Sequence, residues 1–317
     1  MKKIFIVFLA FVMIFTMMTG CGTSEKVNED RIKVVTTIFP EYDWVMNVLG
    51  DEAENFDVQL LMADGVDLHS FQPSVEDIVK ISSCDLFIFV GGESDLWVKD
   101  ALSEAKNEDM IVISLMDIVS ENVKVEELVE GMEAEDAEGP EFDEHVWLSL
   151  RNAGRIVGVI GNAVSQIDPE NEDIYQANAT EYIEKLNSLD KKYIEAKAAA
   201  GKNTVLFGDR FPFRYLVDDY GIKYFAAFLG CSADSEASFE TVTFLANKVD
   251  ELELNTILTT ESDNFGIAKT IADSSKRETE ILSMNSMQSV TREDVDNGIT
   301  YLSIMEDNLK TLEKALN

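Results

Sequence analysis

The sequence predicts an α/β protein of two lobes, each a mainly parallel sheet flanked by helices, with one long rigid helix joining them. Short apolar runs alternate with amphipathic stretches, which is typical of strand–helix–strand units. This alternation occurs twice along the 317 residues. A long stretch without glycine or proline separates the two occurrences, so we expect two lobes and a helical connection.

The first half carries the pattern of a parallel sheet. A helical stretch containing Trp44 and Val48 follows the first apolar run, and Ser74 with Asp77 three residues later is typical of a helix start. The apolar runs are short and rich in β-branched residues, as strands buried on both faces require. We expect strands at residues 31–38, 58–62, 84–90 and 110–114.

The second half repeats the scheme, with expected strands at residues 203–207, 224–228, 256–260 and 279–282. In open α/β sheets, ligands bind outside the carboxyl ends of the strands. His69, Asp209 and Glu261 each follow a predicted strand closely. These three side chains are therefore candidates for a common binding face.

The connection between the halves is predicted to be a single helix. Apolar residues such as Tyr175, Leu186 and Tyr193 recur at spacings close to three and four, and charged residues fill the other positions. We place the N-terminal lobe at 31–168, the linker helix at 169–201 and the C-terminal lobe at 202–317. A rigid linker limits hinge opening between the lobes.

The N-terminus has the features of an export signal. Lys2 and Lys3 precede an apolar run from Ile4 to Phe15, which is too short to span a bilayer comfortably. The sequence Met-Thr-Gly-Cys21 resembles the lipobox of bacterial lipoproteins, in which the cysteine becomes the lipidated N-terminus. We expect a signal peptide at 1–20, a lipid on Cys21 and a polar tether at 21–30.

The chain is strongly acidic, with a net charge of −34 before processing and −36 without residues 1–20. Phosphate binding needs a basic face, so a nucleic-acid partner is excluded. Such a charge also repels anionic lipid headgroups. Attachment to the membrane is therefore expected through the lipid alone.

Cys84 and Cys231, far apart in the chain, do not form a disulfide framework, and Cys84 is expected to be a buried structural thiol.

The chain contains only two histidines, and both lie beside acidic residues. His69 stands in Val-Asp-Leu-His-Ser-Phe-Gln-Pro, and His145 stands in Asp-Glu-His-Val-Trp-Leu. Neutral imidazole is the commonest protein ligand for zinc-like ions. The two histidines therefore predict a metal site, whereas hydrogen-bonded surface or helix-capping histidines are the alternative reading.

These segments resemble the metal-ion-binding proteins of bacterial ABC importers, the zinc- and manganese-uptake lipoproteins of the ZnuA and TroA type. Asp67-Leu-His69-Ser-Phe-Gln-Pro73 is similar to the family's Asp-Pro-His-Thr-Tyr-Glu-Pro. Asp143-Glu-His145-Val-Trp-Leu is similar to its Asp-Pro-His-Val-Trp-Leu, and residues 84–97 and the final helix also fit. The likeness runs from about Val34 to the C-terminus and implies that His69 and His145 are metal ligands.

The sequence differs from the family at the positions of the third and fourth metal ligands. Many relatives have a third histidine, or a glutamate, after the first strand of the C-terminal lobe, where this chain has Gly208-Asp209-Arg210. Asp209 is assigned as the ligand, because a guanidinium has no lone pair to donate and a carboxylate binds metal directly. Glu261 corresponds to a family glutamate that is either a ligand or structural. Asn285 and Gln288 are not assigned.

Two imidazoles with one or two carboxylates suit zinc in four-coordination, or manganese and iron with more oxygen ligands. We expect Zn²⁺, with Mn²⁺ as the next choice. Because the imidazoles must be deprotonated, affinity should fall below about pH 6.

The resemblance implies an extracytoplasmic solute-binding lipoprotein rather than an enzyme. Such a protein captures a divalent transition-metal ion between its lobes and delivers it to an ABC permease and its ATPase. The sequence has no phosphate-cradling motif, so ATP is expected to be handled by the partner. We expect a monomer, held by lipid at the extracytoplasmic face of the cell membrane.

Two alternatives remain at this point. A zinc-dependent hydrolase also uses two histidines and a carboxylate, although the sequence lacks His-Glu-x-x-His. A degenerate relative that has lost its metal, acting as an adhesin or as a receptor for another solute, is the other alternative.

Residues 121–144 hold eleven acidic residues. This acidic loop either concentrates cations by its charge or is a solvated insertion without a specific site.

Overall fold

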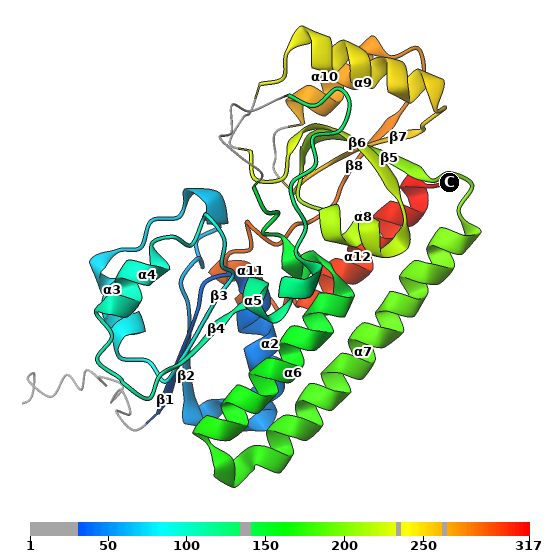
Figure 1. Ribbon diagram of the computed structural model, residues 1–317. Coiled ribbons are helices and arrows are strands. Elements are labelled where there is room, and N and C mark those ends of the chain that lie inside the picture. The colour runs from blue at the N-terminus through cyan, green and yellow to red at the C-terminus, as the bar shows by residue number, and fades with distance from the viewer. Residues whose placement is uncertain (1–30, 134–140, 233–235, 262–264) are drawn as a thin grey trace, which may run out of the picture. The chain divides into compact units, whose positions relative to one another are not determined.

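The computed structural model describes residues 31–133, 141–232, 236–261 and 265–317. Its strands form two four-stranded parallel sheets, one in each half of the chain, as Figure 1 shows. Among the described residues, no helix has both the length and the apolar character needed to cross a membrane. The predicted signal peptide, Cys21 and the tether lie outside the described residues, as does the centre of the acidic loop.

The N-terminal sheet has the strand order β2-β1-β3-β4. The strands are β1 (Ile32–Thr36), β2 (Phe56–Leu60), β3 (Leu86–Phe89) and β4 (Ile111–Ser114). The helices of this half are α2 (Phe39–Leu49), α3 (Val75–Ser82), α4 (Val98–Ser103), α5 (Leu115–Ile118) and α6 (Leu150–Ile167). Short 3₁₀ turns occur at η1 (Gly50–Asn55), η2 (Leu68–Ser70), η3 (Ser120–Asn122), η4 (Val146–Leu148) and η5 (Pro169–Asn171).

Local sequence explains where these helices begin. Ser74 Oγ accepts a hydrogen bond from the backbone N–H of Asp77, and the Asp77 carboxylate accepts from the backbone N–H of Ser74. This reciprocal pair is the predicted capping box, which satisfies two donors at the first turn of α3. Pro40 lies in the first turn of α2, where its missing N–H costs nothing.

The C-terminal sheet has the strand order β6-β5-β7-β8. The strands are β5 (Thr204–Phe211), β6 (Lys223–Leu229), β7 (Thr256–Thr259) and β8 (Glu280–Ser283). The helices are α8 (Arg214–Tyr220), α9 (Phe239–Glu251), α10 (Gly266–Ser274), α11 (Arg292–Asp296) and α12 (Tyr301–Ala315). The main difference from expectation is β5, which continues through Asp209 and Arg210 to Phe211 instead of ending at Phe207.

The long helix α7 (Glu172–Ala199) joins the halves, as predicted. It packs against α2 and α6 of the first half and against α8 and α12 of the second (Figure 1). Its buried face consists of Tyr175, Ala179, Tyr182, Leu186, Leu189 and Tyr193. Because the same apolar stripe contacts both halves, α7 connects the lobes through packing as well as through the chain.

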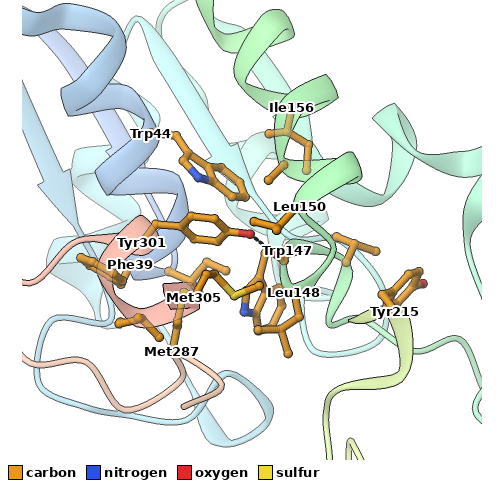
Figure 2. Close-up of a cluster of buried hydrophobic side chains, with 14 of the residues drawn as sticks. Phe39, Trp44, Trp147, Leu148, Leu150, Ile156, Tyr215, Met287, Tyr301 and Met305 are labelled. Atoms are coloured by element: carbon orange, nitrogen blue, oxygen red, sulfur yellow. Dashed lines mark hydrogen bonds between the residues drawn. The ribbon is translucent and has the colours of Figure 1, made fainter. Parts of the chain in front are cut away.

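One apolar core is shared by the two lobes, and each sheet has a smaller core on its other face. In the shared core, Trp44 packs edge-on against Tyr301 of α12, with ring centroids 5.1 Å apart. Figure 2 shows Trp147 in the same cluster, where the Tyr301 hydroxyl donates to the Trp147 carbonyl oxygen at 2.7 Å. The segment just after His145 is thus anchored in the centre of the molecule.

Candidate metal centre

His69 lies in the short turn η2, beyond the carboxyl end of β2. The Asp67 carboxylate caps this turn by accepting a hydrogen bond from the His69 backbone N–H at 3.0 Å. On the ring, Nδ1 lies 2.8 Å from Ser94 Oγ and 3.6 Å from Glu144 Oε2. These contacts on Nδ1 leave Nε2 as the atom available to a ligand.

His145 is fully buried and is fixed by Asp143. One oxygen of that carboxylate accepts from the His145 backbone N–H at 2.9 Å and lies 3.0 Å from ring Nδ1. Since a carboxylate accepts hydrogen bonds, Nδ1 carries the proton and Nε2 presents a lone pair. A carboxylate that accepts a hydrogen bond from the non-ligating ring nitrogen is the usual way in which a metal-binding imidazole is oriented.

The C-terminal lobe holds the His145 segment in place. The Tyr215 hydroxyl donates to the Asp143 carbonyl oxygen at 2.8 Å. The Trp147 indole N–H donates to the Ser286 carbonyl oxygen at 2.9 Å. His145 therefore belongs to the N-terminal lobe by sequence but is positioned by contacts with both lobes.

The two imidazoles meet through their Nε2 atoms, which lie 3.3 Å apart. A zinc ion bonds imidazole nitrogen at about 2.0–2.1 Å, and a tetrahedral angle then separates two such nitrogens by about 3.3–3.4 Å. The observed separation matches this value. The structure thus brings together the two histidines that the sequence singled out, in a geometry that suits a shared cation.

A third potential donor is Cys231, in the loop after β6. One ligand atom each from His69, His145 and Cys231 lie within 4.8 Å of one another. The preceding residue, Gly230, permits this approach, because a Cβ at that position would lie 3.1 Å from His145 Cε1 and 2.8 Å from the Phe211 carbonyl oxygen. The Cys231 backbone N–H donates to Glu126 Oε1 at 3.1 Å.

Sequence reasoning considered Cys231 only as a possible disulfide partner and missed its position beside the histidines. The available signal was its place just beyond a predicted strand, at the same sheet edge as the other candidates. Cys84 is buried elsewhere in the N-terminal lobe, where its thiol donates to the Ile81 carbonyl oxygen at 3.2 Å. Both cysteines are free thiols in the structure.

The surroundings of the histidines are acidic. A pocket of about 220 Å³ is lined by His69, Glu93, Ser94, Glu141, Phe142, Glu144 and Cys231. Glu144 is almost fully buried, and no hydrogen-bond donor among the described residues reaches its Oε2. A buried carboxylate oxygen without a donor favours a cation nearby.

Burial and the neighbouring charges shift the pKa values of the histidines and of Cys231. Burial, followed by the neighbouring His145, lowers the pKa of His69 to about 3. Burial also opposes charge on His145, but Asp143 and then Glu126 and Glu144 outweigh it and hold the pKa of His145 above its usual value. Burial and the same three carboxylates raise the pKa of the Cys231 thiol.

The two other predicted ligands have different partners. Asp209 lies within β5, at a register shift between Phe207 and Arg210, and its Oδ2 accepts from the backbone N–H and hydroxyl of Thr260 at 3.0 and 2.6 Å. Arg210 forms an ion pair with Asp67. Asp209 is not part of the donor group found among the described residues, so its role as a ligand stays a prediction.

Glu261 organises the turn that follows β8. Its two carboxylate oxygens accept from the Ser286 backbone N–H and hydroxyl, each at 2.8 Å. They also accept from the Gln288 backbone N–H and the Ser289 hydroxyl, each at 3.2 Å. Of the two roles considered for Glu261, these contacts provide a structural one, and the ligand role stays a prediction.

Comparison with known families agrees with this architecture. The family described as "Zinc-uptake complex component A periplasmic", or ZnuA, matches residues 34–315, nearly the whole described part of the chain. The chain belongs to this family. The resemblance inferred from the two histidine segments is thereby confirmed.

Relatives of this ZnuA-family chain are named for zinc. A zinc-binding lipoprotein, AdcA of Streptococcus pneumoniae, is 31% identical over 99% of the chain, which spans 61% of that longer relative. The high-affinity zinc uptake system protein ZnuA of Bacillus subtilis is 30% identical over 95% of the chain and 94% of its own length. None of these names denotes an enzyme, in agreement with the prediction of a binding protein.

A solved structure supports the fold. The Zn(II)-bound ZnuA-like domain of Streptococcus pneumoniae AdcA has a TM-score of 0.72 and 30% identity, covering 90% of this chain and 99% of that domain. The predicted fold class, with two parallel sheets and a long connecting helix, is therefore confirmed.

Proposed function

We propose that this ZnuA-family chain is the extracytoplasmic solute-binding lipoprotein of an ABC importer. It captures a divalent transition-metal ion between its lobes, with zinc preferred and manganese next, and delivers the ion to a permease driven by an ATPase. The observation that carries the proposal is the 3.3 Å separation of His69 Nε2 and His145 Nε2. Two imidazoles this close, His145 buried and His69 partly buried, with both Nδ1 atoms engaged, suit a shared cation better than they suit packing.

The preference for zinc has three supports. The nitrogen separation fits tetrahedral coordination at zinc bond lengths, and two relatives are named for zinc binding and zinc uptake. The Irving–Williams order also makes zinc a tighter binder than manganese at almost any site of this type.

Metal titration tests the proposal directly. The chain from residue 22 onward contains all of the compact unit Ile32–Asn317 and, stripped of metal, is titrated with Zn²⁺ and then Mn²⁺. We expect His69→Ala and His145→Ala each to lose at least about 2 kcal/mol of binding free energy, roughly 30-fold in affinity. Lys185→Ala, on the exposed face of α7, serves as the control.

Two results would decide against the proposal. Wild-type protein that binds neither ion would favour the degenerate relative that acts as an adhesin or as a receptor for another solute. Unchanged affinity in either histidine variant would remove that residue from the site.

Membrane attachment is proposed to depend on Cys21. Lipid on this cysteine, after removal of residues 1–20, holds the domain at the extracytoplasmic face of the cell membrane by a polar tether. In cells that express the full chain, Cys21→Ala should move the protein from the membrane fraction to the soluble extracytoplasmic fraction or the medium. A Cys84→Ala control should stay with the membrane, and equal partition of the two variants would exclude the anchor.

A further inference from the structure

We propose that Cys231 is the C-terminal lobe's ligand to the captured cation, so that the site is His69, His145 and a thiolate. This inference rests on the proposed function and specifies the chemistry of the same site. A soft sulfur donor selects zinc over manganese, because thiolate ligands suit zinc while manganese prefers carboxylate, carbonyl and water. The cation then joins the two lobes through direct bonds to each.

The separations between the three donor atoms are close to those expected around a bound zinc ion. Zinc bonds nitrogen at about 2.0–2.1 Å and sulfur at about 2.3 Å, and a tetrahedral angle separates the two donors by about 3.6 Å. The Cys231 sulfur lies within 4.8 Å of one ring nitrogen of each histidine. A closing movement of about 1.2 Å at most therefore brings the sulfur to the separation that a shared zinc ion requires.

The loop that carries Cys231 is built to approach the histidines. Gly230 passes so close to His145 and to the Phe211 carbonyl that a larger residue would clash. Glu126, from the acidic loop that follows the N-terminal sheet, accepts a hydrogen bond from the Cys231 backbone N–H. A loop held from both lobes keeps the sulfur at the site without needing the ion.

A second observation is the unsatisfied negative charge beside the two histidines. Glu144 and Cys231 line one pocket with His69, and Glu144 Oε2 is buried without a hydrogen-bond donor among the described residues. Asp143 Oδ2 is also buried without a donor in this part of the structure. Two carboxylate oxygens in this condition produce a negative potential that a divalent cation relieves.

The other C-terminal candidates among the described residues have partners elsewhere. Among the described residues, the cluster of potential metal ligands consists of His69, His145 and Cys231. Arg210, next to the predicted ligand Asp209, pairs with Asp67. Asp209 is bonded to Thr260. Cys231 is thus the donor by which this chain closes its site.

Binding through sulfur has a defined proton balance. Without a cation Cys231 is a free thiol. When the divalent ion enters, the S–H bond breaks, a sulfur–metal bond forms and the proton leaves to solvent, because a coordinating thiol is deprotonated by the charge of the metal. Each captured ion therefore releases one proton from Cys231.

Cobalt(II) reports sulfur ligation directly and is the probe we choose. The metal-stripped chain from residue 22 is loaded with Co²⁺, and the near-ultraviolet thiolate-to-cobalt charge-transfer absorption is recorded for wild type, Cys231→Ser and Cys84→Ser. We expect the absorption in wild type and in the Cys84→Ser control, and its loss in Cys231→Ser. Zn²⁺ affinity should fall at least tenfold in Cys231→Ser while Mn²⁺ affinity changes little, so that the preference for zinc decreases.

The outcomes separate this inference from the proposed function. Wild-type protein that binds Co²⁺ without the thiolate absorption, or Cys231→Ser with wild-type zinc affinity, would overturn Cys231 as a ligand while leaving the histidine site in place. Failure of wild type to bind any of the three ions would overturn both. The spectrum of wild type alone decides the inference if Cys231→Ser does not fold.

Discussion

A single oxygen of Asp143 accepts two hydrogen bonds from His145, one from the backbone N–H at 2.9 Å and one from ring Nδ1 at 3.0 Å. This arrangement fixes both the orientation of the ring and the nitrogen that carries the proton. It leaves Nε2 of His145 directed at Nε2 of His69. The Asp143 carboxylate therefore determines which ring nitrogen His145 presents at the proposed metal site.

Asp143→Asn should weaken metal binding although the side chain keeps its shape. An amide oxygen still accepts, but the negative charge that makes the imidazole a stronger donor is lost. Loss of such a partner typically costs roughly 10–100-fold in metal affinity. Zinc titration checks this. Asp168→Asn is the control, since Asp168 accepts from Tyr175 and Asn171 at the start of the linker. An equal effect of both variants would contradict the role assigned to Asp143.

Glu261→Ala should lower stability more than metal affinity. Four donors of the 286–289 turn lose their acceptor, and removing a carboxylate that satisfies several partly buried donors costs about 2 to 3 kcal/mol of unfolding free energy. Urea denaturation of the metal-free protein measures the first effect, and zinc titration measures the second. A loss of zinc affinity as large as that in His69→Ala would instead establish Glu261 as a ligand.

Tyr301→Phe tests the contact between α12 and the segment that follows His145. The variant removes the hydroxyl that donates to the buried Trp147 carbonyl oxygen, while the ring keeps its packing against Trp44. An unsatisfied buried carbonyl costs about 1 to 2 kcal/mol. Urea denaturation should show a lower unfolding free energy for this variant than for Tyr42→Phe, the matched change at a partly exposed tyrosine. Equal unfolding free energies of the two variants would show that the Tyr301–Trp147 hydrogen bond does not contribute.

Asp43 should make stability depend on pH. Burial raises the pKa of this carboxyl to about 6, although the Tyr182 hydroxyl donates to it at 2.9 Å. The folded state therefore holds a proton between about pH 4 and 6 that the unfolded state, with a pKa of about 3.9, has released. Protonation favours folding in this window, so the contribution of Asp43 to stability declines as pH rises through 6.

The measurement is the unfolding free energy of wild type minus that of Asp43→Asn, which cannot titrate. This difference should fall by about 2 to 3 kcal/mol between pH 4 and pH 7. Subtraction removes the effect of the many other carboxylates. A difference that stays constant with pH would show that Asp43 titrates normally.

Most of the fold was accessible from the sequence because its signals are local. Strand residues such as those of β1 and β3 form short apolar runs, the capping box of Ser74 and Asp77 acts within four residues, and the helix α7 is defined by the spacing of its own apolar face. β5 was the exception. Its bulge near Asp209 depends on pairing with β6, which a local pattern does not contain.

The candidate site was also predicted only in part from the sequence. His69 and His145 were predicted because each lies in a recognisable segment, and histidine is rare in this chain. The place of Cys231 just beyond a predicted strand was visible in the sequence. Its proximity to the histidines was not, since it depends on a loop of one lobe meeting a turn of the other across 86 residues of chain from His145. The partners of Asp209 and Glu261 are likewise set by neighbouring strands and turns.

By itself, the sequence determined the fold class, the connecting helix and the two histidine segments, because apolar periodicity, capping and composition act over short distances along the chain. The tertiary structure alone decided that the two Nε2 atoms face each other, that the Cys231 sulfur lies beside them and that Asp209 and Glu261 have partners of their own. Those relationships depend on sheet order, register and the packing of one lobe on the other, which arise only when distant segments meet.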